Sequence, residues 1–174
     1  HHSTTVGRRV VGHSLVQGLY VLLGRRCPVA PQLYRQRGTC QAEDVPFHSK
    51  IDLMEDLIRT FEPVAGTRTH VLVDTWYAAK RIWRAARARG FLITSGLKSN
   101  RALRVDDPTS QSGWRWQTLS QYAATLSEAD YTPQTWPSQT EPHPVYVHIV
   151  QTRVRRLYRC QALIVRQSLT APLS

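Results

Sequence analysis

The spacing of apolar residues in the first part of the chain predicts strands followed by a helix. The apolar stretch at 15–23 is typical of a strand, a turn follows at 24–26, and residues 28–34 continue as a second extended segment. Pro28 and Pro31 indicate that this second strand is irregular or lies at an edge. After a polar connection at 37–48, Ser49 and Asp52 have the spacing of a capping box, and the following apolar residues have the helical period: Ile51, Met54, Leu57, Ile58 and Phe61.

A strand–helix–strand pattern comes next. Residues 70–74 read as a strand, and the uninterrupted apolar run at 71–73 predicts burial on both of its faces. A helix is expected from about Trp76 to Arg89, ended by Gly90, and a further strand at 91–97. The order strand, strand, helix, strand, helix, strand predicts an α/β fold.

The composition changes after Asn100, and residues 106–166 predict a mostly β appendage. Strands are expected at 145–150 and 157–165 with a turn near 153–156, and a short helix within 122–128. This region also holds Trp114, Trp116 and Trp136, which either fill a small core or stack on unpaired bases. We favour the core, because tryptophan more often serves that purpose.

The charge of the chain favours a polyanionic partner. The 174 residues include 23 Lys and Arg against 12 Asp and Glu, a net charge of +11. No acidic residue occurs between Thr75 and Val105, whereas basic residues are frequent there. Such a surface attracts phosphates, and the alternative is a basic face that is merely solvated. No apolar run is long enough to span a bilayer, so we expect no membrane partner. Three scattered cysteines and histidines without ligand spacing favour a reduced, cytoplasmic protein without zinc.

Asp74 is the candidate for chemistry, because it directly follows the apolar run of the 70–74 strand. In open α/β sheets, functional residues gather at the carboxyl ends of the strands. A carboxylate beside a basic helix is a plausible ligand for a divalent metal that acts on phosphate. Asp is also a favoured helix cap, and its position alone favours the cap over the catalyst.

Two motifs in this region resemble those of a known family. Asp74-Thr75-Trp76-Tyr77 and Leu97-Lys98-Ser99-Asn100-Arg101 are similar to the segments around the second catalytic aspartate of bacterial insertion-sequence transposases of the DDE type. The resemblance covers most of the chain and is strongest at 47–104. It implies an RNase H-like fold, in which a mixed sheet of antiparallel and parallel strands carries flanking helices. The first strand and the last catalytic helix would be absent. Residues 1–105 would form a partial core, 106–166 a β-rich insertion and 167–174 a tail.

The resemblance also implies DNA transposition by cleavage and strand transfer, with DNA as the partner and Mg²⁺ as the cofactor. Asp74 would be catalytic and a metal ligand, and the DNA-binding candidates are Lys80, Arg84, Arg87, Lys98 and Arg101. Residues 1–42 and 142–174 contain no acid, so the first and third carboxylates of the family have no counterpart at their expected places. We therefore expect an internal fragment that is inactive alone. The alternatives are a non-catalytic nucleic-acid-binding module descended from a transposase, and a remnant without a stable fold.

Overall fold

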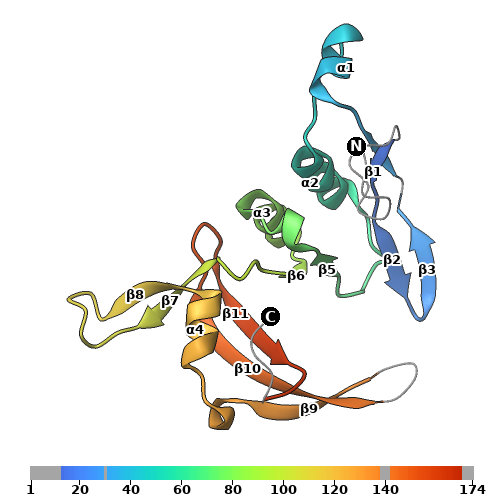
Figure 1. Ribbon diagram of the computed structural model, residues 1–174. Helices are drawn as coiled ribbons and strands as arrows, with labels where there is room; N and C mark the ends of the chain where they lie inside the picture. The colour runs from blue at the N-terminus through green and yellow to red at the C-terminus, as the bar shows by residue number, and fades with distance from the viewer. Residues whose placement is uncertain (1–12, 30, 138–141, 170–174) are drawn as a thin grey trace. The chain divides into compact units, whose positions relative to one another are not determined.

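A computed structural model describes residues 13–29, 31–137 and 142–169, and the chain divides into two compact units, 1–95 and 96–174. Both contain helices and strands, which confirms the expected α/β class; the strands of the described residues form five small sheets (Figure 1). The unit boundary precedes β7 (Ala102–Asp106), whereas the composition places it at 105, inside that strand. None of the helices in the described ranges is long and apolar enough to cross a membrane.

The first unit begins with two short antiparallel pairs where the sequence predicts two longer strands. The first predicted strand is interrupted near Gly18, where an added Cβ would come within 3.3 Å of the Leu57 side chain. Leu23 and Gly24 form the hairpin turn with φ values of +48° and +77°, which suits a tight two-residue connection. The second predicted strand is irregular, as its prolines indicate. The strands are β1 (Ser14–Val16) paired with β4 (Gln32–Tyr34), and β2 (Leu19–Leu22) paired with β3 (Arg25–Pro28).

Two helices follow, and only the second was expected. The predicted polar connection at 37–48 contains the short helix α1 (Arg37–Ala42), in which Cys40 is buried. Six residues give too little periodicity for a helix to be recognised. Helix α2 (Lys50–Thr60) begins at the predicted capping box: the Ser49 hydroxyl accepts from the Asp52 amide, and the Ser49 amide donates to the Asp52 carboxylate.

The expected strand–helix–strand unit is present. Strand β5 (His70–Val73) pairs in parallel with β6 (Leu92–Ser95), and α3 (Lys80–Ala88) connects them. Gly90 ends the helix with φ of +70°, as predicted. The helix begins later than Trp76, because a separate 3₁₀ turn, η1 (Thr75–Tyr77), comes first.

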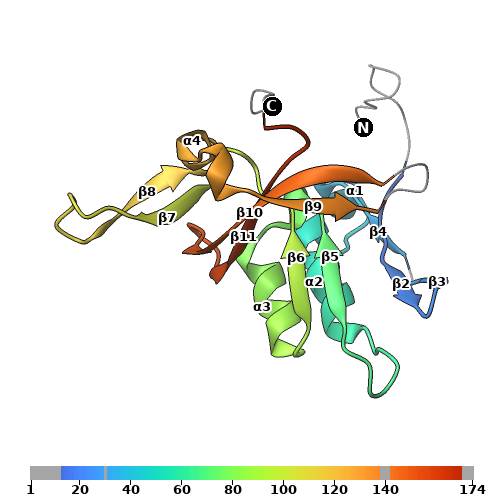
Figure 2. The same ribbon diagram turned by 90° about the horizontal axis from the view of Figure 1, so that it is seen from below.

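Helices α2 and α3 lie side by side in the first unit (Figure 2) and share its core. Ile82 and Ala86 are fully buried against residues of α2 and β1. The buried members of this core are Val16, Leu53, Met54, Ile58, Ile82, Ala85, Ala86 and Phe91. The apolar period of α2 therefore predicted its core-facing side correctly.

The prediction that residues 71–73 are buried on both faces is wrong. Val71 and Val73 pack against the helices, whereas Leu72 between them is 72% exposed. Side chains alternate across a strand, and within the described part of the unit only one face of the β5–β6 pair is covered. The apolar run reports hydrophobicity but does not report whether a second layer is present.

The second unit is mostly β, as expected for the region after 106. The predicted strand at 145–150 lies within a longer antiparallel pair, and the strand predicted at 157–165 is confirmed from Arg159, two residues later than expected. The predicted helix occurs three residues earlier. Leu103 and Val154 are fully buried where β7 meets the connection between that pair. The elements after β7 are β8 (Trp114–Thr118), α4 (Leu119–Thr125), η2 (Glu128–Asp130), β9 (Thr132–Trp136), β10 (His143–Arg153) and β11 (Arg159–Arg166).

Candidate functional site

Asp74 lies at the carboxyl end of β5, where it caps the 3₁₀ turn η1. Its Oδ1 atom accepts hydrogen bonds from the backbone amides of Trp76 (2.9 Å) and Tyr77 (3.3 Å). The carboxylate is exposed. The geometry therefore contains the cap that the sequence favoured, and it leaves the aspartate open to solvent at the position where α/β sheets carry functional groups.

The two aromatic residues after Asp74 have different environments. Trp76 is 79% exposed, whereas Tyr77 packs against the core of the unit. Burial raises the pKa of Tyr77, and the nearby negative charge of Asp74 raises it further. Tyr77 is therefore a neutral, anchored phenol at ordinary pH, and it fixes the turn that presents Asp74.

Three of the predicted DNA-binding residues lie on α3, the helix that follows this turn. Lys80, Arg84 and Arg87 are exposed, at a spacing of four and three residues along the helix. Ile82, Ala85 and Ala86 are the buried residues of α3, so the basic and core-facing sides of the helix are distinct. The structure thus gathers four of the six predicted site residues on one η1–α3 segment: Asp74, Lys80, Arg84 and Arg87.

The other two predicted DNA-binding residues, Lys98 and Arg101, belong to the second unit. They precede β7 and form a turn in which the Arg101 amide donates to the Lys98 carbonyl at 2.9 Å. The carbonyl of Arg101 accepts from the amide of Leu119, at the start of α4. Lys98 is exposed and Arg101 is half-buried.

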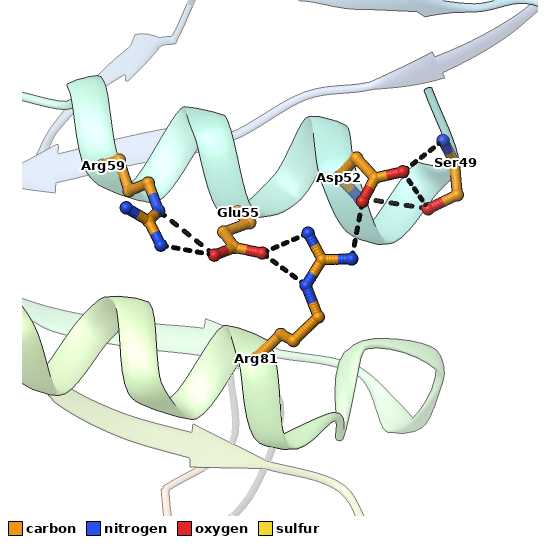
Figure 3. Close-up of polar contacts among 5 residues, drawn as sticks. All are labelled: Ser49, Asp52, Glu55, Arg59 and Arg81. Carbon is orange, nitrogen blue, oxygen red and sulfur yellow. Dashed lines mark hydrogen bonds and ion pairs between the residues drawn. The ribbon is translucent and has the colours of Figure 1, made fainter. Parts of the chain in front are cut away.

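An ionic cluster between α2 and α3 was not predicted from the sequence (Figure 3). Glu55 is 4% exposed, although it is not among the apolar residues whose spacing predicts α2. One of its oxygens accepts from Arg59 at 2.6 Å and the other from Arg81 at 2.6 Å. Arg81 also reaches Asp52 at 2.7 Å. Arg81 therefore joins the two helices through two carboxylates.

The cluster keeps both carboxylates ionised. Hydrogen bonds from the Ser49 hydroxyl and the Ser49 amide, together with Arg81, lower the pKa of Asp52 to about 2. Burial acts to raise the pKa of Glu55, but hydrogen bonds from Arg59 and Arg81 outweigh it and the pKa is lowered. The only sequence signal for this cluster is the four-residue spacing of Glu55 and Arg59. Arg81 lies far along the chain from Asp52 and Glu55, so its contacts with them have no local pattern.

The described residues do not fit a pair of magnesium ions. Each magnesium ion requires several oxygen ligands. Asp74 supplies one carboxylate, and its Oδ1 already accepts hydrogen bonds from two backbone amides. No group of three or more His, Cys, Asp or Glu able to hold a metal occurs within residues 13–29, 31–137 and 142–169. Asp52 and Glu55 are committed to arginines, so they do not complete such a site.

Comparison with known proteins adds no assignment. A scan against protein-family models, a search of curated proteins and a search of solved structures each returned no match.

Proposed function

We propose that this chain acts in DNA transposition, as a part of a DDE-type transposase with an RNase H-like core. In this proposal Asp74 is the second catalytic carboxylate, and the basic side of α3 binds the DNA backbone. Residues 106–166 form the β-rich insertion. The further carboxylates needed for metal-dependent strand cleavage come from outside the described residues.

The observation that carries the proposal is the position of Asp74. It directly follows the first strand of a parallel β5–α3–β6 unit and is exposed at the carboxyl end of that strand. This is the place where α/β folds present catalytic groups. The sequence around it carries both motifs of the transposase resemblance in the order that the family requires.

The basic residues of α3 support the DNA part of the proposal. Lys80 begins α3, with two residues between it and the end of the η1 turn, and Arg84 and Arg87 continue the same exposed side. A row of cations contacts phosphates without reading base sequence and releases counterions on binding. A catalytic carboxylate needs this neighbour, because its own charge repels the backbone that it must approach.

A second candidate is a nucleic-acid-binding module without catalysis. It is favoured by the cap geometry of Asp74, whose Oδ1 holds η1 in place, and by the missing cluster of carboxylates in the described part of the chain. This module would bind DNA in the absence of any metal, with an affinity that falls steeply as salt rises.

The two candidates separate in an assay of metal-dependent nicking of supercoiled plasmid. The catalytic proposal requires that a transposase completed around this sequence nicks DNA and that Asp74→Asn abolishes nicking while DNA binding persists. The asparagine is the informative variant, because it keeps an oxygen to cap η1 and removes only the charge. Nicking that survives Asp74→Asn would exclude Asp74 as a catalytic residue.

A further inference from the structure

The second unit contains a basic cavity that neither Asp74 nor α3 contributes to. Its volume is about 580 Å³, and it lies between β7 and the ends of β10 and β11 that adjoin their connection. The residues that bear on its chemistry are Arg104, Asp106, Gln151, Arg153, Tyr158 and Arg159.

Two of these arginines lie directly opposite each other on neighbouring strands of the sheet. Arg153 and Arg159 are direct partners in the antiparallel pairing of β10 with β11, and both are exposed. Like charges in directly opposite positions destabilise a strand pair. Neither guanidinium has an ion-pair partner in the part of the chain that the structure describes. The pair thus concentrates positive charge that an anion would neutralise.

Arg104 brings a third guanidinium from β7 and is held by its neighbours. Its guanidinium carbon lies 4.7 Å from the centre of the Trp114 ring, and its carbonyl accepts from the Thr152 hydroxyl at 2.7 Å. The amide of Arg155 donates to the Ala102 carbonyl at 2.8 Å, which joins the same strand to the β10–β11 connection. These contacts fix β7 beside the two opposed arginines before any ligand binds.

The charge and the size of the cavity indicate its ligand. Three arginines against one acid, Asp106, give a net positive lining, and guanidinium groups bind phosphate through paired hydrogen bonds. The volume exceeds what a single phosphate fills and lies in the range of small-molecule sites. Tyr158 and Gln151 add a ring and an amide that can orient a second, planar part of a ligand.

We propose that this cavity binds the phosphate of a nucleotide through Arg104, Arg153 and Arg159. The same chemistry is offered by a free nucleotide and by one residue of a single-stranded nucleic acid, and the experiment separates these sources. The proposal does not rest on transposition, because it uses no residue of the first unit.

The experiment measures binding by isothermal titration with three probes: pyrophosphate, ATP without metal, and a short oligothymidylate. The test variant is the double substitution Arg153→Gln, Arg159→Gln. Its matched control is Arg155→Gln, Arg156→Gln, which removes the same charge from exposed residues of the adjoining connection that do not line the cavity. The test variant is expected to bind the probes about tenfold or more weakly, because each of its two substitutions removes a charge-assisted contact with phosphate. The control should stay within about threefold of the wild type.

The outcomes are distinguishable. Loss of ATP and pyrophosphate binding in the test variant alone supports the proposal with a free nucleotide as ligand. Loss of oligothymidylate binding in that variant alone, when the small probes do not bind, supports it with a single strand as ligand. Equal losses in both double variants, or no binding of any probe to the wild type, would overturn it. Asp106→Asn provides a test that does not depend on folding of the double variant: it must strengthen binding, and unchanged or weaker binding counts against the proposal.

Discussion

Two groups of arginines, one in each unit of this protein, have opposite surroundings. Between α2 and α3, Arg59 and Arg81 are paired with Glu55, and Arg89 pairs with Glu62 at 3.0 Å while donating to the Phe61 carbonyl at 2.8 Å. In the second unit, Arg153 and Arg159 are direct partners on neighbouring strands, and neither makes an ion pair with the described residues. The first set holds helices together, and the second set is arranged for an external anion.

This comparison shows that net charge alone does not locate a binding surface. Arg81 belongs to the longest basic stretch of the sequence, but its guanidinium is ion-paired with Asp52 and Glu55. Arg84, three residues later, is exposed and makes no ion pair with the described residues. Function is therefore expected from the arginines that the fold leaves for solvent.

The largest effect is expected from Arg81→Met, which keeps much of the side-chain volume and removes the charge. Glu55 would stay buried with only Arg59 as a partner, and removing one member of a buried ion pair is strongly destabilising. The midpoint of thermal unfolding should fall by several degrees, as followed by circular dichroism. Arg84→Met is the matched control on the same helix and should leave the midpoint nearly unchanged. Equal midpoints for the two variants would show that the cluster contributes nothing.

The next effect is a loss of stability in acid that depends on Asp52. Its pKa of about 2 in the folded chain lies below the ordinary value of 3.8. The ionised Asp52 therefore stabilises the fold fully at a pH above its ordinary pKa, and this stabilisation is lost as the pH falls towards its pKa in the folded chain. Urea unfolding between about pH 6 and pH 2 should show this decline in the wild type and a shallower one in Asp52→Asn. Parallel curves would mean that Asp52 has no stabilising charge interaction.

A smaller effect is expected at the cap of η1. Asp74→Ala removes the acceptor of the Trp76 and Tyr77 amides and should lower the free energy of unfolding by about 1 kcal/mol. Asp74→Asn should lie close to the wild type, because its amide oxygen still accepts. Urea titration measures both. If the asparagine variant is as unstable as the alanine variant, the charge rather than the cap holds the turn.

The smallest effect, and the only one of opposite sign, is expected in the second unit. Arg153→Gln with Arg159→Gln removes a like-charge pair, so the free energy of unfolding should rise by about 0.5 kcal/mol. The same variant is expected to lose phosphate binding, which separates binding from stability. A clear fall in stability would mean that these arginines support the fold, as Arg81 does.

Local signals in the sequence predicted most of the first unit. The Ser49–Asp52 capping box, the apolar period of α2 and the glycine at the end of α3 each depend on neighbours within about one turn, and all three are confirmed. The parallel β5–β6 pair follows from the order of the elements. The interpretation of Asp74 as a cap also depends on neighbouring residues, and its hydrogen bonds from the two backbone amides are present.

Predictions that depended on distant residues were wrong or missing. The exposure of Leu72 reflects the absence of a covering layer in the described unit, which an apolar run cannot report. The partners of Arg81 lie 26 and 29 positions away, so its role had no local signal. The favoured core role of the tryptophans is also wrong in part, since Trp116 and Trp136 are exposed and Trp114 is half-buried beside Arg104.

The central claim is that this chain binds DNA through the basic side of α3. It is tested by measuring the binding of a short fluorescent DNA duplex across a range of salt concentrations. We expect the affinity to fall steeply with salt, and Arg84→Gln with Arg87→Gln to reduce the slope of log affinity against log salt by about 2. The matched control, Arg25→Gln with Arg26→Gln, removes the same charge from exposed positions of β3 and should leave the slope near that of the wild type. Binding that is absent, insensitive to salt or equally reduced in both double variants would contradict it.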